Sequence, residues 1–159
     1  MSIDLGRELG KAREQLQLGN KTEAARLSRR LAKRFKTSAE PCVLLAEAEQ
    51  AQGQIEKSCK AMRDACRRSP RSAQLFAAYG DLCMAAEQFD NALGGYRSAL
   101  ALEPGALPYK SRLAAALQAV GSIADATVLH REVLEASPND AQAHFYVGTA
   151  LKRAHDFAG

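Results

Sequence analysis

Tryptophan is absent from this chain of 159 residues, and phenylalanine and tyrosine are scarce at 6% together. The apolar content of 47% suffices for a core, but only for a thin one. No run approaches the 18 apolar residues of a membrane-spanning helix. The segment from Met1 to Gly10 lacks the apolar stretch of a secretory signal. We therefore expect one cytoplasmic domain.

Motifs that carry chemistry are missing as well. The four cysteines, none in a C-x-x-C pair, are expected to be buried and reduced, with a metal or redox role as the alternative: Cys42, Cys59, Cys66 and Cys83. His130 and His144 lack a third ligand, so core packing explains them better than zinc. No nucleotide-binding or hydrolase motif occurs. We expect no enzymatic activity, no cofactor and no metal.

What the sequence does contain is a period of 34 residues, marked by Pro70, Pro104 and Pro138. The same order of small and large apolar residues precedes each proline. Counted back from Pro104, its members are Phe76, Tyr79, Gly80, Cys83, Phe89, Ala92, Tyr96, Ala99 and Leu100. A period of this length predicts a solenoid built from one repeated supersecondary unit.

Small residues recur where the two helices of each unit must approach closely. One column holds Ala12, Ala46, Gly80, Ala114 and Gly148, and the column facing it holds Ala24, Ser58, Ala92 and Ala126. Glycines at 19, 53 and 121 predict left-handed caps at the ends of first helices, and Glu87 and His155 replace glycine in the other copies. Gly94 and Gly95 interrupt a helical pattern, which indicates close packing or a soft spot.

These columns resemble the tetratricopeptide repeat, a helix-turn-helix of 34 residues with small residues in mid-helix and a closing proline. The resemblance implies an all-α, right-handed superhelical solenoid of antiparallel helix pairs, forming one domain over 1–159. The full repeats are expected at 39–72, 73–106 and 107–140. Residues 5–38 form a degenerate repeat, with Lys36 where the family has proline, and residues 141–159 supply only a first helix.

The resemblance also implies a function, because first helices of such arrays line a concave groove that holds a peptide or helix of a partner protein. The residues expected there are Arg13, Val43, Leu44, Glu47, Asp81, Met84, Arg112, Tyr146 and Lys152. For Val43 and Leu44, packing against neighbouring helices is the alternative. The carboxylate clamp and the asparagine ladder known from two specialised branches of the family are absent.

Charge is concentrated at the N-terminal end. Residues 1–38 hold ten Lys or Arg against four Asp or Glu, whereas the remainder holds twelve against fourteen. The basic side chains crowd one expected helix: Arg26, Arg29, Arg30, Lys33, Arg34 and Lys36. A solvated terminal face is the favoured interpretation. A patch for acidic partners is an alternative, and nucleic acid is disfavoured because Phe35 is the only aromatic nearby.

The last expected helix has no partner helix, which would expose Val147, Leu151 and Phe157. Either the natural polypeptide continues beyond Gly159, which we favour, or a second copy covers this face as a homodimer. Proteins of bacteria join such arrays to sulfotransferase or glycosyltransferase domains. The predicted function is therefore a protein-interaction scaffold, and the alternative is a substrate-presenting arm of a larger transferase.

Overall fold

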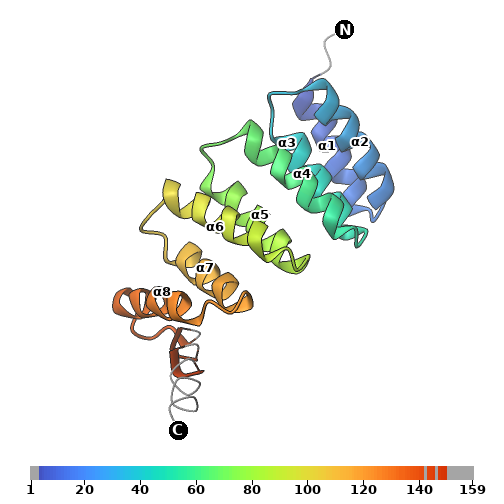
Figure 1. Cartoon of the computed structure of the whole chain (residues 1–159). Coiled ribbons are helices and arrows are strands. Elements are labelled where there is room, and N and C mark those ends of the chain that lie inside the picture. Colours follow the sequence, from blue (N-terminus) through green and yellow to red (C-terminus); the bar gives the residue numbers. More distant parts are fainter. Residues whose placement is uncertain (1–3, 142, 146, 150–159) are drawn as a thin grey trace.

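The computed structural model describes residues 4–141, 143–145 and 147–149, and within them all regular structure is helical (Figure 1). Eight helices precede residue 137: α1 (Leu5–Gln17), α2 (Lys21–Arg34), α3 (Glu40–Ala51), α4 (Ile55–Arg68), α5 (Ala73–Ala85), α6 (Phe89–Leu102), α7 (Leu107–Ala119) and α8 (Ile123–Ala136). No described helix is both long and apolar enough to cross a bilayer.

The helices pack as consecutive hairpins that stack in chain order. Within each hairpin α1 packs on α2, α3 on α4, α5 on α6 and α7 on α8, and each second helix also contacts the first helix of the next hairpin. Figure 1 shows the resulting staircase from α1 to α8. One hairpin lies within each 34-residue window expected from the sequence. The predicted all-α solenoid is confirmed.

Small side chains lie where the helices of a hairpin cross. The residues of the two columns that are fully buried are Ala12, Ala24, Ala46, Ser58, Ala92, Ala114 and Ala126. In the second hairpin the Ser58 hydroxyl donates to the Ala46 carbonyl at 2.8 Å. The side chains are short enough for the backbone of one helix to approach the other, so the predicted contact is confirmed.

The first helices all end in a left-handed turn. Positive φ values of 81°, 75° and 84° occur at Gly19, Gly53 and Gly121. Glu87 adopts the same conformation, with a φ of 57°. There the amide of Gln88 donates to the carbonyl of Cys83 at 2.8 Å, and the amide of Glu87 donates to Met84 at 3.1 Å. These two bonds define a Schellman cap, so the turn forms even where the sequence lacks glycine.

The second helices end in two different ways. Helices α4, α6 and α8 each stop two residues before a proline, in agreement with the predicted role of Pro70, Pro104 and Pro138. Helix α2 has no such proline. Its end is held by Arg68 of the next hairpin, whose guanidinium donates to the carbonyls of Ala32, Phe35 and Ser38, each at 3.0 Å. A side chain thus satisfies carbonyls that the helix end leaves open.

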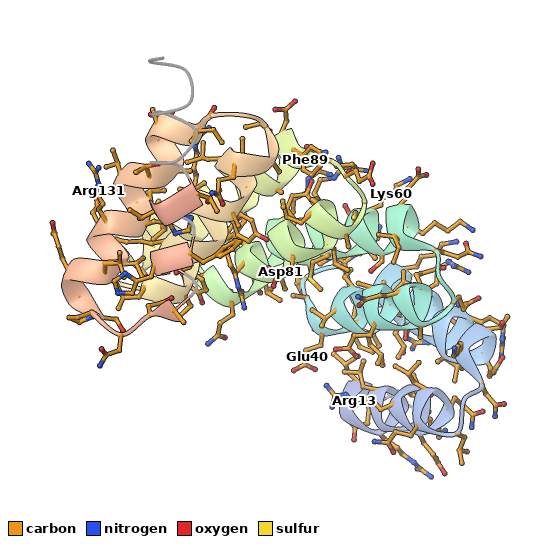
Figure 2. All side chains as sticks on the ribbon, turned by 90° about the horizontal axis from the view of Figure 1, so that it is seen from below. Arg13, Glu40, Lys60, Asp81, Phe89 and Arg131 are labelled. Carbon is orange, nitrogen blue, oxygen red and sulfur yellow. The ribbon has the colours of Figure 1, made fainter. Side chains whose placement is uncertain are left out.

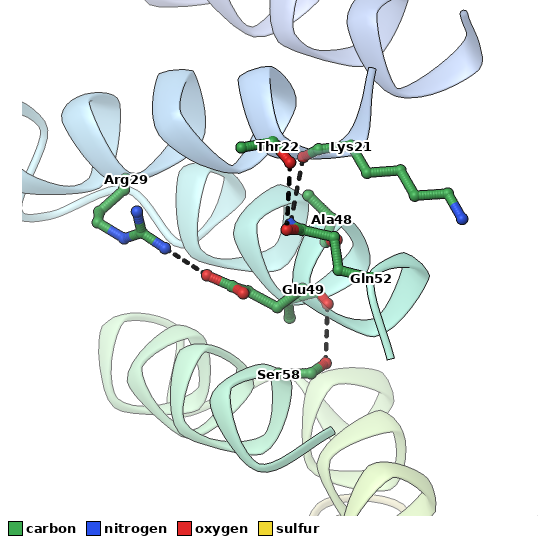
Figure 3. A network of polar contacts seen from close by, with 8 residues as sticks. Lys21, Thr22, Arg29, Ala48, Glu49, Gln52 and Ser58 are labelled. Carbon is green, nitrogen blue, oxygen red and sulfur yellow. Dashed lines mark hydrogen bonds and ion pairs between the residues drawn. The ribbon is translucent and has the colours of Figure 1, made fainter. Parts of the chain in front are cut away.

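Polar contacts join the first hairpin to the second (Figure 3). The Gln52 amide nitrogen donates to the carbonyls of Lys21 at 3.3 Å and Ala48 at 3.1 Å. Arg29 pairs with Glu49, a carboxylate that is only 3% exposed and stands in a column expected to hold a packing residue. The ion pair compensates the cost of burying that charge.

The helices of the third hairpin approach each other closely at two glycines. A β-carbon at Gly80 would lie 2.5 Å from the Tyr96 ring, and one at Gly95 would lie 2.9 Å from the Phe76 carbonyl oxygen. Nothing lies within 4 Å of the corresponding position at Gly94. The close-packing interpretation therefore applies to Gly95, whereas Gly94 faces open space.

Candidate functional site

The first helices present a row of charged side chains on one face of the array. Arg13, Glu47, Asp81 and Arg112 are exposed on α1, α3, α5 and α7, respectively. Figure 2 shows Arg13 and Asp81 on the inner side of the bend of the array, with Lys60 and Phe89 on its outer side. We call the surface made by α1, α3, α5 and α7 the concave face.

Two adjoining hollows lie on the concave face. The smaller, of about 340 Å³, includes Glu47 and Gln50 of α3 and Ala78 and Asp81 of α5. The larger, of about 500 Å³, extends from α5 to α7 and is lined by Gln74, Ala77, Ala78, Asp81, Glu103, Ala106, Pro108, Tyr109 and Arg112. The hollows share Ala78 and Asp81 in their linings, so they adjoin each other along three repeats, and together we call them the channel.

Asp81 is the centre of a polar cluster in this channel. The Tyr96 hydroxyl donates to Asp81 Oδ1 at 2.9 Å, and Arg112 Nη1 lies 3.2 Å from Asp81 Oδ2. Burial, together with the Asp81 carboxylate, raises the pKa of Tyr96 well above its ordinary value, so the phenol stays a donor. The sequence predicts Asp81 and Arg112 as two separate charges of the groove. The structure pairs them instead, across α5 and α7.

The prediction that Leu44 lines the groove is wrong. Its side chain is 2% exposed and packs with Leu9, Ala12 and Leu31, so the packing alternative holds for this residue. Val43 and Met84 are half-buried and pack against the main core. These apolar members of the predicted set thus serve wholly or partly as packing residues.

Other predicted residues lie near the C-terminal end of the chain. Val147 is half-buried. The other residues predicted for this region lie outside the described residues: Tyr146, Lys152, Leu151 and Phe157.

The sequence reasoning missed Tyr109, which lines the larger hollow. It also missed the hydrogen bond from the Tyr96 hydroxyl to Asp81, because the repeat pattern predicts only a packing residue at position 96. A hydroxyl at the end of a buried ring, fifteen positions after a carboxylate on the facing helix, was the available signal.

The basic patch of α2 is partly neutralised. Arg26 pairs with Glu23 at 2.6 Å, Arg29 with Glu49, and Arg30 lies 3.8 Å from Glu8. The hydrogen bond from Arg26 lowers the pKa of the exposed Glu23 carboxyl. The basic side chains of this patch with no ion pair in the described part of the chain are Lys33, Arg34 and Lys36.

Buried titratable groups favour their neutral forms. All four cysteines are buried and free, and burial raises the pKa of Cys59 to about 12 and that of Cys66 to about 11. Burial lowers the pKa of His130, an effect that Asp140 opposes. The described residues contain no cluster of three potential metal ligands. The four buried cysteines are therefore suited to packing and not to nucleophilic attack.

No model of a protein family matches the sequence, and no curated protein matches it at a significant level. The fold is nevertheless similar to solved structures. MamA from Desulfovibrio magneticus has a TM-score of 0.81 at 17% identity, over 98% of this chain and 88% of that one. YrrB, a TPR protein described as having an unusual peptide-binding site, has a TM-score of 0.79 at 16% identity, over 96% and 78%.

A thermophilic TPR protein from Thermus thermophilus has a TM-score of 0.61 at 26% identity, over 93% of this chain and 81% of that one. These similarities agree with the period, the caps and the stacked hairpins described above. The chain therefore has the fold of tetratricopeptide-repeat proteins, a right-handed superhelical solenoid of antiparallel helix pairs.

Proposed function

We propose that the chain is a protein-interaction module whose concave face binds a segment of a partner protein. The observation that carries the proposal is the channel formed by the two hollows from α3 to α7. A channel of this length suits an extended peptide or one face of a helix better than a compact metabolite. The peptide-binding site named for YrrB supports the same class of function.

The charges along the channel define the partner that would fit. Glu47 is exposed and forms no ion pair within the described residues, so it is available to a basic side chain. Asp81 and Arg112 already neutralise each other. The short side chains of Ala77 and Ala78 form an apolar floor in the larger hollow. We infer a segment with a small or medium apolar residue over Ala78 and a Lys or Arg near Glu47.

The test is a selection from a random dodecapeptide library on the immobilised full chain, followed by fluorescence anisotropy with labelled selected peptides. Ala78→Leu fills the shared part of both hollows, and Glu47→Lys reverses the free charge. Each is expected to weaken binding about tenfold or more. Arg97→Glu, at an exposed position of α6 that lines neither hollow, is the matched control and should leave the affinity unchanged. Equal binding to the wild type, Ala78→Leu and Glu47→Lys by every selected peptide would contradict the proposal.

The homodimer, the cytoplasmic location and the transferase-arm alternative remain predictions of the sequence. No observation on the described residues favours the transferase arm over the scaffold. The scaffold is the function that the channel and its charges support best.

A further inference from the structure

A second groove lies on the opposite face of the array, between α4 and α6. It consists of two hollows, of about 480 and 170 Å³, that share Arg63 and Tyr79. The rings of Phe76 and Tyr79 and the backbone of Gly95 contribute to the larger hollow. We call this surface the outer groove. It lies on the side of the molecule where Figure 2 shows Lys60.

The two glycines of α6 give the outer groove its depth. Gly95 allows the α6 backbone to lie against the Phe76 carbonyl, where a β-carbon would be only 2.9 Å away. Gly94 leaves open the space that a side chain would otherwise occupy. The volume of about 480 Å³ falls in the range of about 300–1,000 Å³ found for small-molecule sites, and it has room for one large apolar side chain.

The α4 wall of the outer groove is net basic, because three cationic side chains outnumber the one carboxylate, Glu56. Lys60, Arg63 and Arg67 are all exposed and line the groove about one helical turn apart. Arg67 has a loose, exposed ion pair with Asp64 at 3.5 Å. Lys60 and Arg63 form no ion pair among the described residues. These cations are therefore available to an incoming anion.

The α6 wall differs in character. It contributes Asp90, Asn91 and Ser98, which carry a single negative charge between them. The groove thus has one cationic wall, one mainly neutral wall and a partly aromatic floor. An occupant that matches all three must be apolar in the middle and acidic on one side.

We propose that the outer groove binds a protein segment in which one large apolar side chain is flanked by Asp or Glu. The apolar side chain would enter the hollow at Gly94 and lie over Phe76 and Tyr79, and the carboxylates would pair with Arg63 and Arg67. A nucleic acid fits less well, because its regularly spaced phosphates would come near Asp90 and Glu56, whereas a peptide can place its carboxylates beside Arg63 and Arg67 alone. This site is separate from the concave face, so the chain has the means to hold two partners at once.

To test the proposal, the selected dodecapeptides are grouped by which variants of the chain weaken their binding. Peptides of the outer groove should be net acidic with an apolar residue, and Gly94→Leu should weaken them about tenfold or more by filling the hollow. Leucine is also the better helix former, so the variant is expected to fold. The double variant Arg63→Glu with Arg67→Glu should weaken the same peptides and reduce the salt dependence of binding. Ala78→Leu is the matched control and should not affect them.

Three outcomes would overturn the proposal. The first is a selection in which no peptide is weakened by either Gly94→Leu or the double Arg variant. The second is that the peptides these variants weaken carry no net negative charge. The third is that labelled poly-thymidine binds the wild type and is lost in the double Arg variant but not in Gly94→Leu, which would assign the basic wall to nucleic acid. None of these results depends on whether the concave face binds its own peptides.

Discussion

The second and third hairpins are equivalent units of the array, yet their helices pack together in different ways. In the second hairpin Ala46 faces Ser58, whose hydroxyl donates to the Ala46 carbonyl at 2.8 Å. In the third hairpin Gly80 lies beneath the ring of Tyr96, which is only 2% exposed. One crossing is thus filled by two small side chains, and the other by a ring over a bare backbone. The Tyr96 hydroxyl thereby reaches Asp81 on the concave face.

The comparison shows how a repeat can change its surface while keeping its framework. A glycine on one helix creates room for a large side chain from the facing helix, and the end of that side chain then provides a polar group at the surface. The second hairpin has no counterpart to this, because Met62 stands in the column of Tyr96 there and has no hydroxyl group. The four predictions below test the difference, beginning with the largest effect.

Gly80→Ala should destabilise the protein by about 3 kcal/mol, since three atoms of the Tyr96 ring lie within 3 Å of the new β-carbon and the ring has little room to move. Urea denaturation of both proteins measures the difference in unfolding free energy. In a Tyr96→Leu background the same change should cost less than about 1 kcal/mol. A double-mutant cycle with no coupling would show that the ring is not what requires glycine.

Gly95→Ala should cost about 2 kcal/mol, because the β-carbon would meet the Phe76 carbonyl oxygen at 2.9 Å. Its neighbour provides the matched control. Gly94→Ala should instead raise the unfolding free energy by about 1 kcal/mol, because alanine is the better helix former and nothing obstructs it. Thermal unfolding followed by circular dichroism separates the two variants. Equal effects in the same direction would contradict the close approach at Gly95.

Ser58→Ala should lower the unfolding free energy by about 1 kcal/mol, through loss of the buried hydrogen bond to Ala46. Ser98→Ala tests the same chemistry at an exposed site, where the hydroxyl donates to the Gly94 carbonyl of its own helix at 2.9 Å. That change should be neutral or slightly stabilising. The hydrogen bond of the second hairpin would prove unimportant if urea midpoints showed no difference between the two alanine variants.

Glu87→Gly should stabilise the protein by up to about 1 kcal/mol, because Glu87 holds a φ of 57° that glycine adopts more easily. The reciprocal change in the second hairpin, Gly53→Ala, should destabilise by about 1 kcal/mol at its φ of 75°. The two shifts in unfolding free energy should thus have opposite signs. A loss of stability in Glu87→Gly would mean that the glutamate side chain contributes more than its backbone costs.

The fold could be predicted from the sequence almost completely, because each column has a local physical reason. Glycine at 53 permits a left-handed turn, Pro104 prevents helix continuation, and Ala46 permits close approach. Each of these depends on one residue and its neighbours in the chain. The end of α5 was also predictable, although Glu87 shows that the hydrogen bonds of the cap, and not glycine itself, define the turn.

The surface could be predicted only in outline. Sequence columns identify which helix face a residue occupies, but not which residue it meets across two repeats. Asp81 and Arg112 were both expected on the concave face, and their ion pair depends on the offset between α5 and α7. Leu44 shares a column with Arg112, yet it is buried because α1 packs beside α3. Gly94 and Gly95 were expected to act alike, but as neighbours in a helix they face different directions, and only Gly95 faces α5.

Arg68 has a consequence for how the array holds together. The carbonyls at the end of α2 accept hydrogen bonds from a side chain of the following hairpin, so without that hairpin they would depend on water. In nearest-neighbour terms, this end of the solenoid combines a weak intrinsic unit with a strong interface. Folding is then expected to spread toward the N-terminus from the middle repeats, and fraying is expected to run in the reverse direction.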